Sequence, residues 1–447
     1  MERKHGTSRK NILQFGDPSI ILITGFSTYS FKSKPHFTRF DAKEQTVKGK
    51  KIVIGVTGGI AAYKAAELVR LFVREDAMVQ VAMTANAARF VAPLTFEALS
   101  GNRVISHMFH QEGVAIDHIS WGQESDLVIV APATANFIAK MACGLADDFL
   151  STMVVAATAK ILVCPSMNVQ MFQNPAVQDN LNRLRERGIR VMAPGEGQLA
   201  CRTEGKGRLP EPVEILEQAR ILLTPQDLAG IKILVTAGPT EEPIDPVRFI
   251  TNRSSGKMGY ALARAAADRG AEVILVSGPS SLNTPLGVTL CKVRTALEMR
   301  DTVFEHRHDC AVIIKAAAVS DYRPKEAADQ KIKKGDDDIS LDLIRNPDIL
   351  FELGQKKSDF PHVLVGFAAE TQELLANAME KVKKKNLDMI VANDVSRSDA
   401  GFAADTNQVK IIYADGRVED SPLLSKDEVA GLILDRAMGI RNAASGP

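Results

Sequence analysis

The chain has 447 residues, with 55 Lys and Arg against 54 Asp and Glu, 45% hydrophobic residues and 5% aromatic residues. This length is two to three times that of a typical domain, so we expect at least two hydrophobic cores. The balanced charge gives no indication of a nucleic-acid partner, and no segment reaches the roughly 18 apolar residues that a membrane span needs. Five cysteines without paired ligand spacing argue against a disulfide framework or a zinc site and favour a reducing cytoplasm.

Residues 1–48 begin with a basic stretch, followed by a short apolar patch that Thr and Gly interrupt. The patch has no clear small-residue cleavage site, so a secretory signal is not predicted. We interpret this segment as an N-terminal extension. Two explanations stay open, a disordered segment and translation from an upstream start codon.

Residues 49–229 are predicted to form one α/β domain. An amphipathic helix is expected over 61–75, and runs of Val and Ile predict buried strands over 51–58, 78–84, 126–134, 160–166 and 189–194. Such strands, alternating with helices, indicate a doubly wound parallel sheet covered on both faces.

The alternation of predicted strands and helices begins again in residues 230–447. Strands are predicted over 232–240, 271–279 and 310–324, with a helix over 260–270. Pro225 and Gly230 interrupt two apolar segments at the boundary. The fold class is therefore α/β with two doubly wound, Rossmann- or flavodoxin-like domains, and ligands are expected just beyond the strand ends.

Gly58, Gly59 and Ile60 follow the first strand and open a helix, as in a phosphate-binding turn. An ordinary tight turn explains these residues equally well. The second strand ends in Met83 and Thr84 without the acidic residue of a dinucleotide site, which favours a mononucleotide such as FMN and disfavours an NAD-linked oxidoreductase. Small and amide-bearing residues follow the next strand and suit a flavin ring, namely Ala131, Ala133, Thr134 and Asn136.

Motifs over 58–64, 117–121, 131–148, 165–171 and 200–211 resemble the flavin-containing cysteine decarboxylases, in particular phosphopantothenoylcysteine decarboxylase. The resemblance implies that His118 assists substrate oxidation, Asn168 binds the substrate carboxylate, and Cys201 on a flap donates a proton. FMN would take a hydride equivalent, creating the electron sink that decarboxylation needs, and would later return it. Arg202 stands where the family often has Gly, which leaves the flap conformation open.

The segment 251–259 contains a Gly-Lys pair, but Met258 stands where a P-loop needs Ser or Thr. Motifs over 315–324, 330–334, 346–350, 365–371 and 381–395 together resemble phosphopantothenate-cysteine ligase. The resemblance implies that Asn252 binds the activated acyl group and that Lys331 serves its later conversion. It also implies that CTP is held by Ala317, Asp321, Lys331, Pro347, Asp348, Ile349, Leu350, Phe367, Lys381 and Lys385.

Together the two resemblances imply a bifunctional enzyme of coenzyme A biosynthesis. Its substrates would be 4'-phosphopantothenate, L-cysteine and CTP, with Mg²⁺ and lysines neutralising the phosphates; the metal ligands stay unassigned. The resemblance also implies a homo-oligomer built from decarboxylase trimers and ligase dimers, such as a dodecamer. Two alternatives are a flavin prenyltransferase, which would leave the second half unexplained, and a non-catalytic flavoprotein, which can lose the histidine that is present here.

Overall fold

The computed structural model describes residues 47–108, 117–198, 204–333, 340–359, 362–370, 374–394 and 406–444. The predicted extension, apart from its last two residues, lies outside these ranges, and so does Cys201. Within them, no helix combines the length and the apolar composition needed to cross a membrane.

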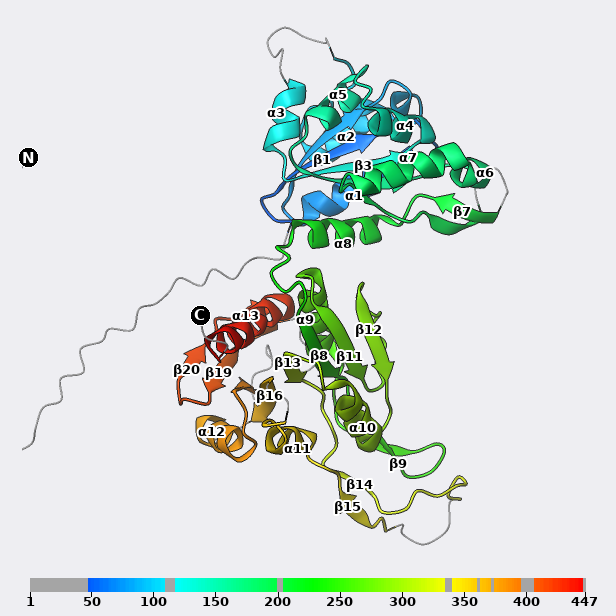
Figure 1. Ribbon diagram of the computed structural model, residues 1–447. Coiled ribbons are helices and arrows are strands. Elements are labelled where there is room, and N and C mark those ends of the chain that lie inside the picture. Colours follow the sequence, from blue (N-terminus) through cyan, green and yellow to red (C-terminus); the bar gives the residue numbers. More distant parts are fainter. Residues whose placement is uncertain are drawn as a thin grey trace, which may run out of the picture. The chain divides into compact units, whose positions relative to one another are not determined.

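A five-stranded parallel sheet with the order β2-β1-β3-β4-β5 organises the first half of the chain (Figure 1). Every residue of the central strand β3 is buried, as expected where helices cover both faces of a sheet. All five predicted strands are present, although the last is shorter than the segment 189–194. The strands are β1 (Lys51–Val56), β2 (Met78–Met83), β3 (Leu127–Ala133), β4 (Lys160–Pro165) and β5 (Arg190–Val191).

Side chains alternate between two apolar layers along each strand of this sheet. On β1, Ile52 and Ile54 pack with α1, α2 and α8, whereas Val53 packs with α4, α5 and α7. These helices are α1 (Ala62–Arg74), α2 (Pro93–Ser100), α4 (Ala135–Cys143), α5 (Phe149–Ala156), α7 (Pro175–Glu186) and α8 (Pro212–Leu223). The other elements are η1 (Ala87–Arg89), α3 (Asp117–Glu124), α6 (Val169–Gln173) and the antiparallel hairpin β6 (Gly195–Gln198) and β7 (Glu204–Arg208).

The second half contains an eight-stranded sheet with the order β12-β11-β8-β13-β16-β17-β19-β20. The strands from β12 to β17 are parallel, as expected of a doubly wound sheet, although only β8, β11 and β13 were predicted as strands; β19 and β20 are antiparallel. The strands are β8 (Lys232–Ala237), β11 (Glu272–Ser277), β12 (Val288–Lys292), β13 (Val312–Lys315), β16 (Val363–Glu370), β17 (Met389–Asp394), β19 (Val409–Tyr413) and β20 (Val418–Asp420).

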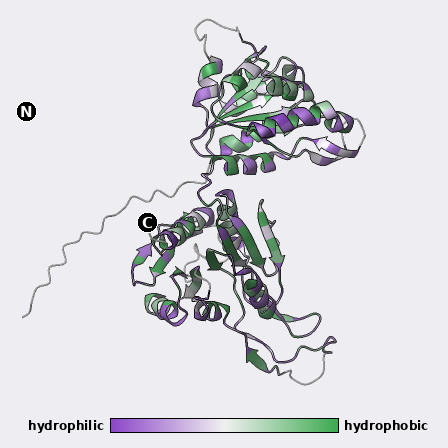
Figure 2. Cartoon of the chain, in the orientation of Figure 1, coloured by the Kyte–Doolittle hydropathy of each residue, from purple (hydrophilic) through white to green (hydrophobic). Residues whose placement is uncertain are grey.

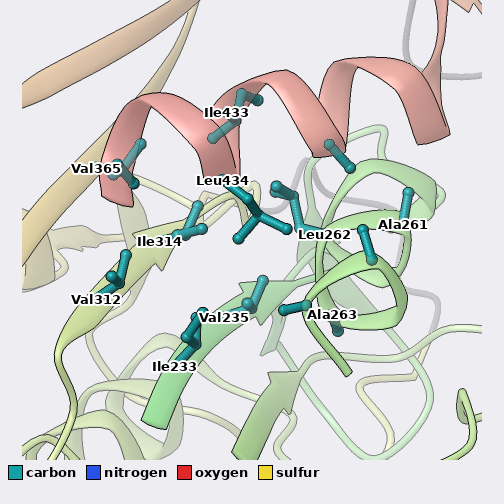
Figure 3. Close-up of a cluster of buried hydrophobic side chains, with 14 of the residues drawn as sticks. Ile233, Val235, Ala261, Leu262, Ala263, Val312, Ile314, Val365, Ile433 and Leu434 are labelled. Carbon is teal, nitrogen blue, oxygen red and sulfur yellow. The ribbon is translucent and has the colours of Figure 1, made fainter. Parts of the chain in front are cut away.

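Helices cover both faces of this sheet as well. Figure 3 shows Leu262 of α9 and Leu434 of α13 over Val235 and Ile314, while Leu234 and Ile313 lie in the opposite layer with α10, α11 and α12. Along the helices, apolar and polar colours alternate, as expected of elements with one buried face (Figure 2). The helices are α9 (Lys257–Asp268), α10 (Ala296–His306), α11 (Ile349–Gln355), α12 (Leu374–Lys384) and α13 (Lys426–Ala444).

Three antiparallel strand pairs complete the second half. They are β9 (Glu241–Pro243) with β10 (Phe249–Thr251), β14 (Tyr322–Pro324) with β15 (Leu343–Arg345), and β18 (Thr406–Asn407) with β21 (Leu424–Ser425). The first two pairs matter for function, because residues predicted to contact the substrates follow closely after them in the chain.

Candidate active sites at two strand reversals

The first sheet reverses its strand order between β1 and β3. The chain continues from β1 to β2 on one side, whereas β3 pairs with β1 on the other side. Loops at such a point separate above the sheet and form the usual ligand crevice of open α/β folds. Gly58 to Ile60 follow β1, and Thr134 to Asn136 follow β3, so both predicted flavin segments lie at this position.

Thr57 joins these two loops and is a residue that the sequence did not single out. Its buried hydroxyl donates to Pro132 O at 2.7 Å and accepts from Thr134 N at 3.0 Å. The Ala131-Pro132 peptide is cis, and the Thr134 side chain in turn accepts from Phe137 N at the start of α4. The loops are therefore held together before any ligand binds.

The two glycines have different reasons to be glycine. A Cβ on Gly58 would lie 2.4 Å from Asn86 Cβ, so the packing of the β2 loop requires a glycine there. A Cβ on Gly59 would meet only Thr134 Cγ2, at an ordinary 3.5 Å. Within the described part of the chain, the N–H groups of Gly58 and Ile60 have no acceptor. Open space and free amides at a helix start fit a bound phosphate.

Thr84 lies beside the same turn. Its N–H donates to Val56 O at 3.0 Å, and its hydroxyl accepts from Ala87 N at 3.3 Å. Asn136 is exposed at the start of α4, whereas Ala133 is buried at the end of β3. The side chains of Ala131 and Ala133 pack in the core, whereas the other predicted flavin residues lie in the loops that follow β1, β2 and β3, at one edge of the sheet.

Asn168 follows β4 and caps α6, accepting from Gln170 N at 2.8 Å. The neighbouring Met167 N donates to Gly207 O at 2.9 Å, which fastens β7 to this loop. A Cβ on Gly207 would lie only 2.3 Å from Met167 O, so this contact requires glycine. The hairpin that carries Cys201 is thus anchored beside Asn168, although Cys201 itself lies outside the described residues.

His118 lies on α3 and is half-buried. This helix packs against α5, where Trp121 meets Phe149 edge to face at 5.6 Å. The structure therefore brings the Asn168 loop and the hairpin together, and the role of His118 beside them stays a prediction.

The second sheet reverses its order between β8 and β13. Gly238, Gly256 and Gly278 lie close together there. A Cβ on Gly278 would lie 1.7 Å from Pro239 O, and a Cβ on Gly256 would lie 3.3 Å from Gly238 N. Gly238 and Gly256 also have positive φ angles of 73° and 77°. Such close backbone turns leave no room for side chains at the point where a ligand is expected.

Several predicted ligase residues meet at this reversal. Asn252, just after β10, donates from Nδ2 to Val319 O at 3.0 Å, and Ala317 N donates to Thr236 Oγ1 at 3.1 Å. Asn346 N donates to Asp321 O at 2.8 Å, which brings Pro347 to the same loop. The structure thus joins Asn252, Ala317, Asp321 and Pro347.

Asp348 and Lys385 form an ion pair of 2.7 Å, and Asp348 caps α11 by accepting from Phe351 N at 3.1 Å. Burial would raise the pKa of Asp348, but the hydrogen bonds from Lys385 and Phe351 N hold it below its ordinary value. The side chains of Ile349 and Leu350 are buried in the apolar layer beneath α11. Only the backbone of these two residues is therefore available to a ligand.

The remaining predicted residues occupy different environments. Phe367 on β16 is partly buried and packs on the layer of α9 and α13, whereas Lys381 on α12 is half-buried. Lys331 is exposed in a segment without helix or strand. No group of three or more His, Cys, Asp or Glu side chains in the described ranges could hold a metal ion.

Three polar groups of the second half, one at the end of β13, one in the chain that follows it and one on β17, were not assigned a role by the sequence analysis. Lys315 ends β13, and burial together with the nearby charge of Lys385 lowers its pKa to about 8. Ser320 Oγ and Asn393 Oδ1 are buried without a hydrogen-bond partner in the described residues. Buried polar groups are normally paired, so these atoms suit a polar ligand. In the sequence they resembled ordinary strand residues.

Comparison with known proteins covers both halves. Residues 41–223 match the family model described as Flavoprotein, and residues 228–440 match the DNA/pantothenate metabolism flavoprotein C-terminal domain. The first half is therefore a flavoprotein domain, and the second half belongs to a domain family of pantothenate metabolism.

Relatives match this chain over nearly their whole length. The coenzyme A biosynthesis bifunctional protein CoaBC of Bacillus subtilis (strain 168) is 48% identical over 393 residues, which cover 87% of this chain and 96% of the relative. The CoaBC protein of Escherichia coli (strain K12) is 45% identical over 395 residues, covering 87% and 97%.

Solved structures match each half. A crystal structure of the C-terminal domain of CoaBC is 47% identical, covers 48% of this chain and 97% of its own, and gives a TM-score of 0.41. The FMN-dependent cysteine decarboxylase SpaF is 30% identical, covers 40% and 97%, and gives a TM-score of 0.34.

The relatives' length and identity confirm the resemblance inferred from the motifs, and they do not favour a prenyltransferase, a non-catalytic flavoprotein or a dehydrogenase. The chain belongs to the family of bifunctional coenzyme A biosynthesis proteins, which combine phosphopantothenoylcysteine decarboxylase and phosphopantothenate-cysteine ligase activities.

Proposed function

We propose that residues 49–229 decarboxylate 4'-phosphopantothenoylcysteine with FMN, and that residues 230–447 form this substrate from 4'-phosphopantothenate, cysteine and CTP. The observation that supports this most is the gathering of family motif residues at the strand reversal of each sheet. Ligands of open α/β sheets bind at such reversals.

The first site fits a flavin mononucleotide. The free amides of Gly58 and Ile60 would bind its phosphate, and Thr84, Thr134 and Asn136 would surround its ring system. When bound, FMN supplies the reversible two-electron chemistry that an unactivated carboxylate needs in order to leave. Asn168 would hold the substrate carboxylate, His118 would assist removal of a proton, and Cys201 would return one.

The second site would activate a carboxylate. The 4'-phosphopantothenate carboxylate attacks the α-phosphate of CTP, releasing pyrophosphate, and the cysteine amine then displaces CMP from the acyl cytidylate. Asn252 would bind the acyl carbonyl, and Lys331 would serve the second step. The triphosphate would lie among Ala317, Asp321, the segment 347–350, Phe367, Lys381 and Lys385.

Lysines and Mg²⁺ would neutralise the phosphates in this site. Because no ready-made carboxylate cluster occurs in the described residues, we propose that Mg²⁺ enters on the triphosphate. Lys315 adds an amine at the carboxyl end of β13, within electrostatic reach of Lys385, Asp348 and Asp321.

We also propose that the protein is a homo-oligomer, with trimer-forming and dimer-forming halves. Exposed apolar side chains support this, because such surfaces mark interaction sites when they are clustered. Those of the first half include Ile60, Tyr63, Phe90 and Leu94, and those of the second include Val247, Phe249, Tyr322 and Leu343. A cytoplasmic location would keep the Cys201 thiol reduced.

One assay tests the whole proposal. The purified chain is given 4'-phosphopantothenate, cysteine, CTP and Mg²⁺, and 4'-phosphopantetheine is measured by mass spectrometry. We expect product together with one pyrophosphate and one CMP per turnover, and a flavin absorbance spectrum from the protein. A colourless chain that does not take up FMN and releases no pyrophosphate from CTP would refute the proposal.

A further inference from the structure

Asp245 is a buried carboxylate to which the proposed reaction gives no role. It lies in the turn between β9 and β10, and its side chain has no exposed surface. Its Oδ1 accepts hydrogen bonds from Val247 N and Arg248 N, each at 2.8 Å. These bonds fix the turn from which β10 runs to Asn252.

The other oxygen of the same carboxylate reaches a distant part of the sequence. Asp245 Oδ2 accepts from Arg248 Nε at 2.9 Å and from Ile332 N at 3.1 Å. Arg248 Nη2 donates to Ile332 O at 3.0 Å. The Asp245-Arg248 pair therefore binds both backbone groups of Ile332, the residue next to Lys331.

The Asp245 carboxylate is suited to keep these hydrogen bonds because it stays ionised. The hydrogen bond from the Arg248 guanidinium, with those from three backbone N–H groups, keeps the pKa of Asp245 well below its ordinary value. It therefore remains ionised at any pH at which the protein works. Charge-assisted hydrogen bonds of this kind are stronger than neutral ones.

The segment around Lys331 depends on hydrogen bonds to the turn between β9 and β10 for its position. Residues 325–333 form no helix or strand, and Ala328 N, which donates to Ile244 O at 2.9 Å, provides a second tie to the same turn. One short turn thus positions Asn252 through β10 and Lys331 through Ile332. Resting on the proposed ligase function, we propose that Asp245 is a positioning residue that presents the Lys331 amine to the activated acyl group.

The test compares the two half-reactions in the full chain. Asp245→Asn keeps the size of the side chain but removes its charge and one acceptor. We expect pyrophosphate release with CTP and 4'-phosphopantothenate, measured in a single turnover without cysteine, to stay within about threefold of wild type. Cysteine-dependent CMP release should fall by roughly 10- to 100-fold, the cost of displacing a reacting group by about 1 Å.

A second readout follows the position of Lys331 directly. Amine-reactive labelling with mass spectrometry measures how far CTP with 4'-phosphopantothenate protects each lysine. In Asp245→Asn we expect the protection of Lys331 to be lost and that of Lys385 to remain. Arg248→Lys, which loses the bond to Ile332 O, should give the same pattern more weakly and serves if Asp245→Asn does not fold.

Glu419→Gln is the matched control, because Glu419 accepts a bidentate pair from Arg436 at 2.9 and 2.6 Å on β20 and α13. It should lower stability without separating the half-reactions. Equal slowing of both steps by Asp245→Asn, or unchanged protection of Lys331, would overturn the inference. A wild-type chain without CTP-dependent pyrophosphate release would instead refute the proposed function.

Discussion

Gly278 shows how strictly single residues are determined at the second strand reversal. An alanine there would place its Cβ 1.7 Å from Pro239 O, a backbone atom that cannot move aside. We expect Gly278→Ala to destabilise the second half by at least about 2 kcal/mol and to weaken CTP binding. Circular dichroism during urea unfolding should show the loss, whereas fluorescence of Trp121, the chain's one tryptophan, should report an unchanged first half.

Gly439 is a glycine at which an added side chain meets no other atom, so its substitution serves as a control for Gly278→Ala. It lies in α13, and an added Cβ would meet nothing within 4 Å. Gly439→Ala should therefore stabilise the helix by about 0.5 to 1 kcal/mol, since glycine loses more backbone entropy on folding than alanine. Destabilisation by this substitution would contradict the packing described for α13.

Lys315 should make stability depend on pH. Its pKa is about 8 in the fold against 10.5 for an ordinary lysine, so the unfolded chain binds an extra proton between these values. Lys315 should therefore contribute a rise in the free energy of unfolding with pH across this window. The thiols of Cys164 and Cys310, whose pKa burial raises, contribute the opposite change at the alkaline end, so the contribution of Lys315 is the difference between wild type and a variant that lacks this amine. Lys315→Met should lack this rise and should be more stable at pH 7 by up to roughly 3 kcal/mol. Urea titrations at pH 7 and pH 10 measure the difference; an identical pH dependence in both proteins would refute it.

At the scale of elements, the hairpin β6/β7 should serve only the first reaction. Its base is fixed by the bond from Met167 N to Gly207 O, next to Asn168. Gly207→Ala would bring a Cβ to 2.3 Å from Met167 O and should displace the hairpin. We expect decarboxylation of supplied 4'-phosphopantothenoylcysteine to fall at least 10-fold, with CTP-dependent ligation unchanged. Equal loss of both activities would point to general unfolding instead.

The elements that the sequence predicted best are the buried parallel strands. Continuous apolar runs such as 126–134 leave few alternatives to a central strand, and β3 occupies that segment. The parallel strands β12, β16 and β17, the antiparallel β19 and β20 and the small hairpins were not predicted. Their pairing depends on contacts between distant segments, as for Thr406 with Ser425, and a local pattern does not contain such information.

The sequence predicted only some residues of the candidate sites, again because a local pattern does not contain contacts between distant segments. Residues directly after strands, such as Gly58 and Thr134, could be chosen because strand ends meet at one edge of the sheet, whereas Ala317 was named only through the resemblance to the ligase family. Thr57, Lys315 and Asp245 were missed. Their importance comes from partners and burial that become visible only when distant loops meet, as when Thr57 binds Pro132 O.

At the scale of the whole molecule, each sheet has its own core and its own strand reversal. The two activities should therefore be separable by single substitutions. Asn252→Asp should slow ligation at least 10-fold, because a second negative charge would repel the acyl cytidylate. The same variant should keep its flavin spectrum and decarboxylate supplied 4'-phosphopantothenoylcysteine at the wild-type rate. Unchanged ligation would remove Asn252 from the scheme, and lost flavin would show that the halves depend on each other.

The edge strand β20 of the eight-stranded sheet affects how readily the protein can aggregate. β20 is three residues long and contains Glu419 and Asp420, and Arg436 of α13 binds Glu419. A strand of three residues offers few free backbone groups to another extended segment, and its two carboxylates are already held by Arg436 and Lys410. The sheet should therefore resist growth into fibrils from this side, even at the high concentrations reached during overproduction.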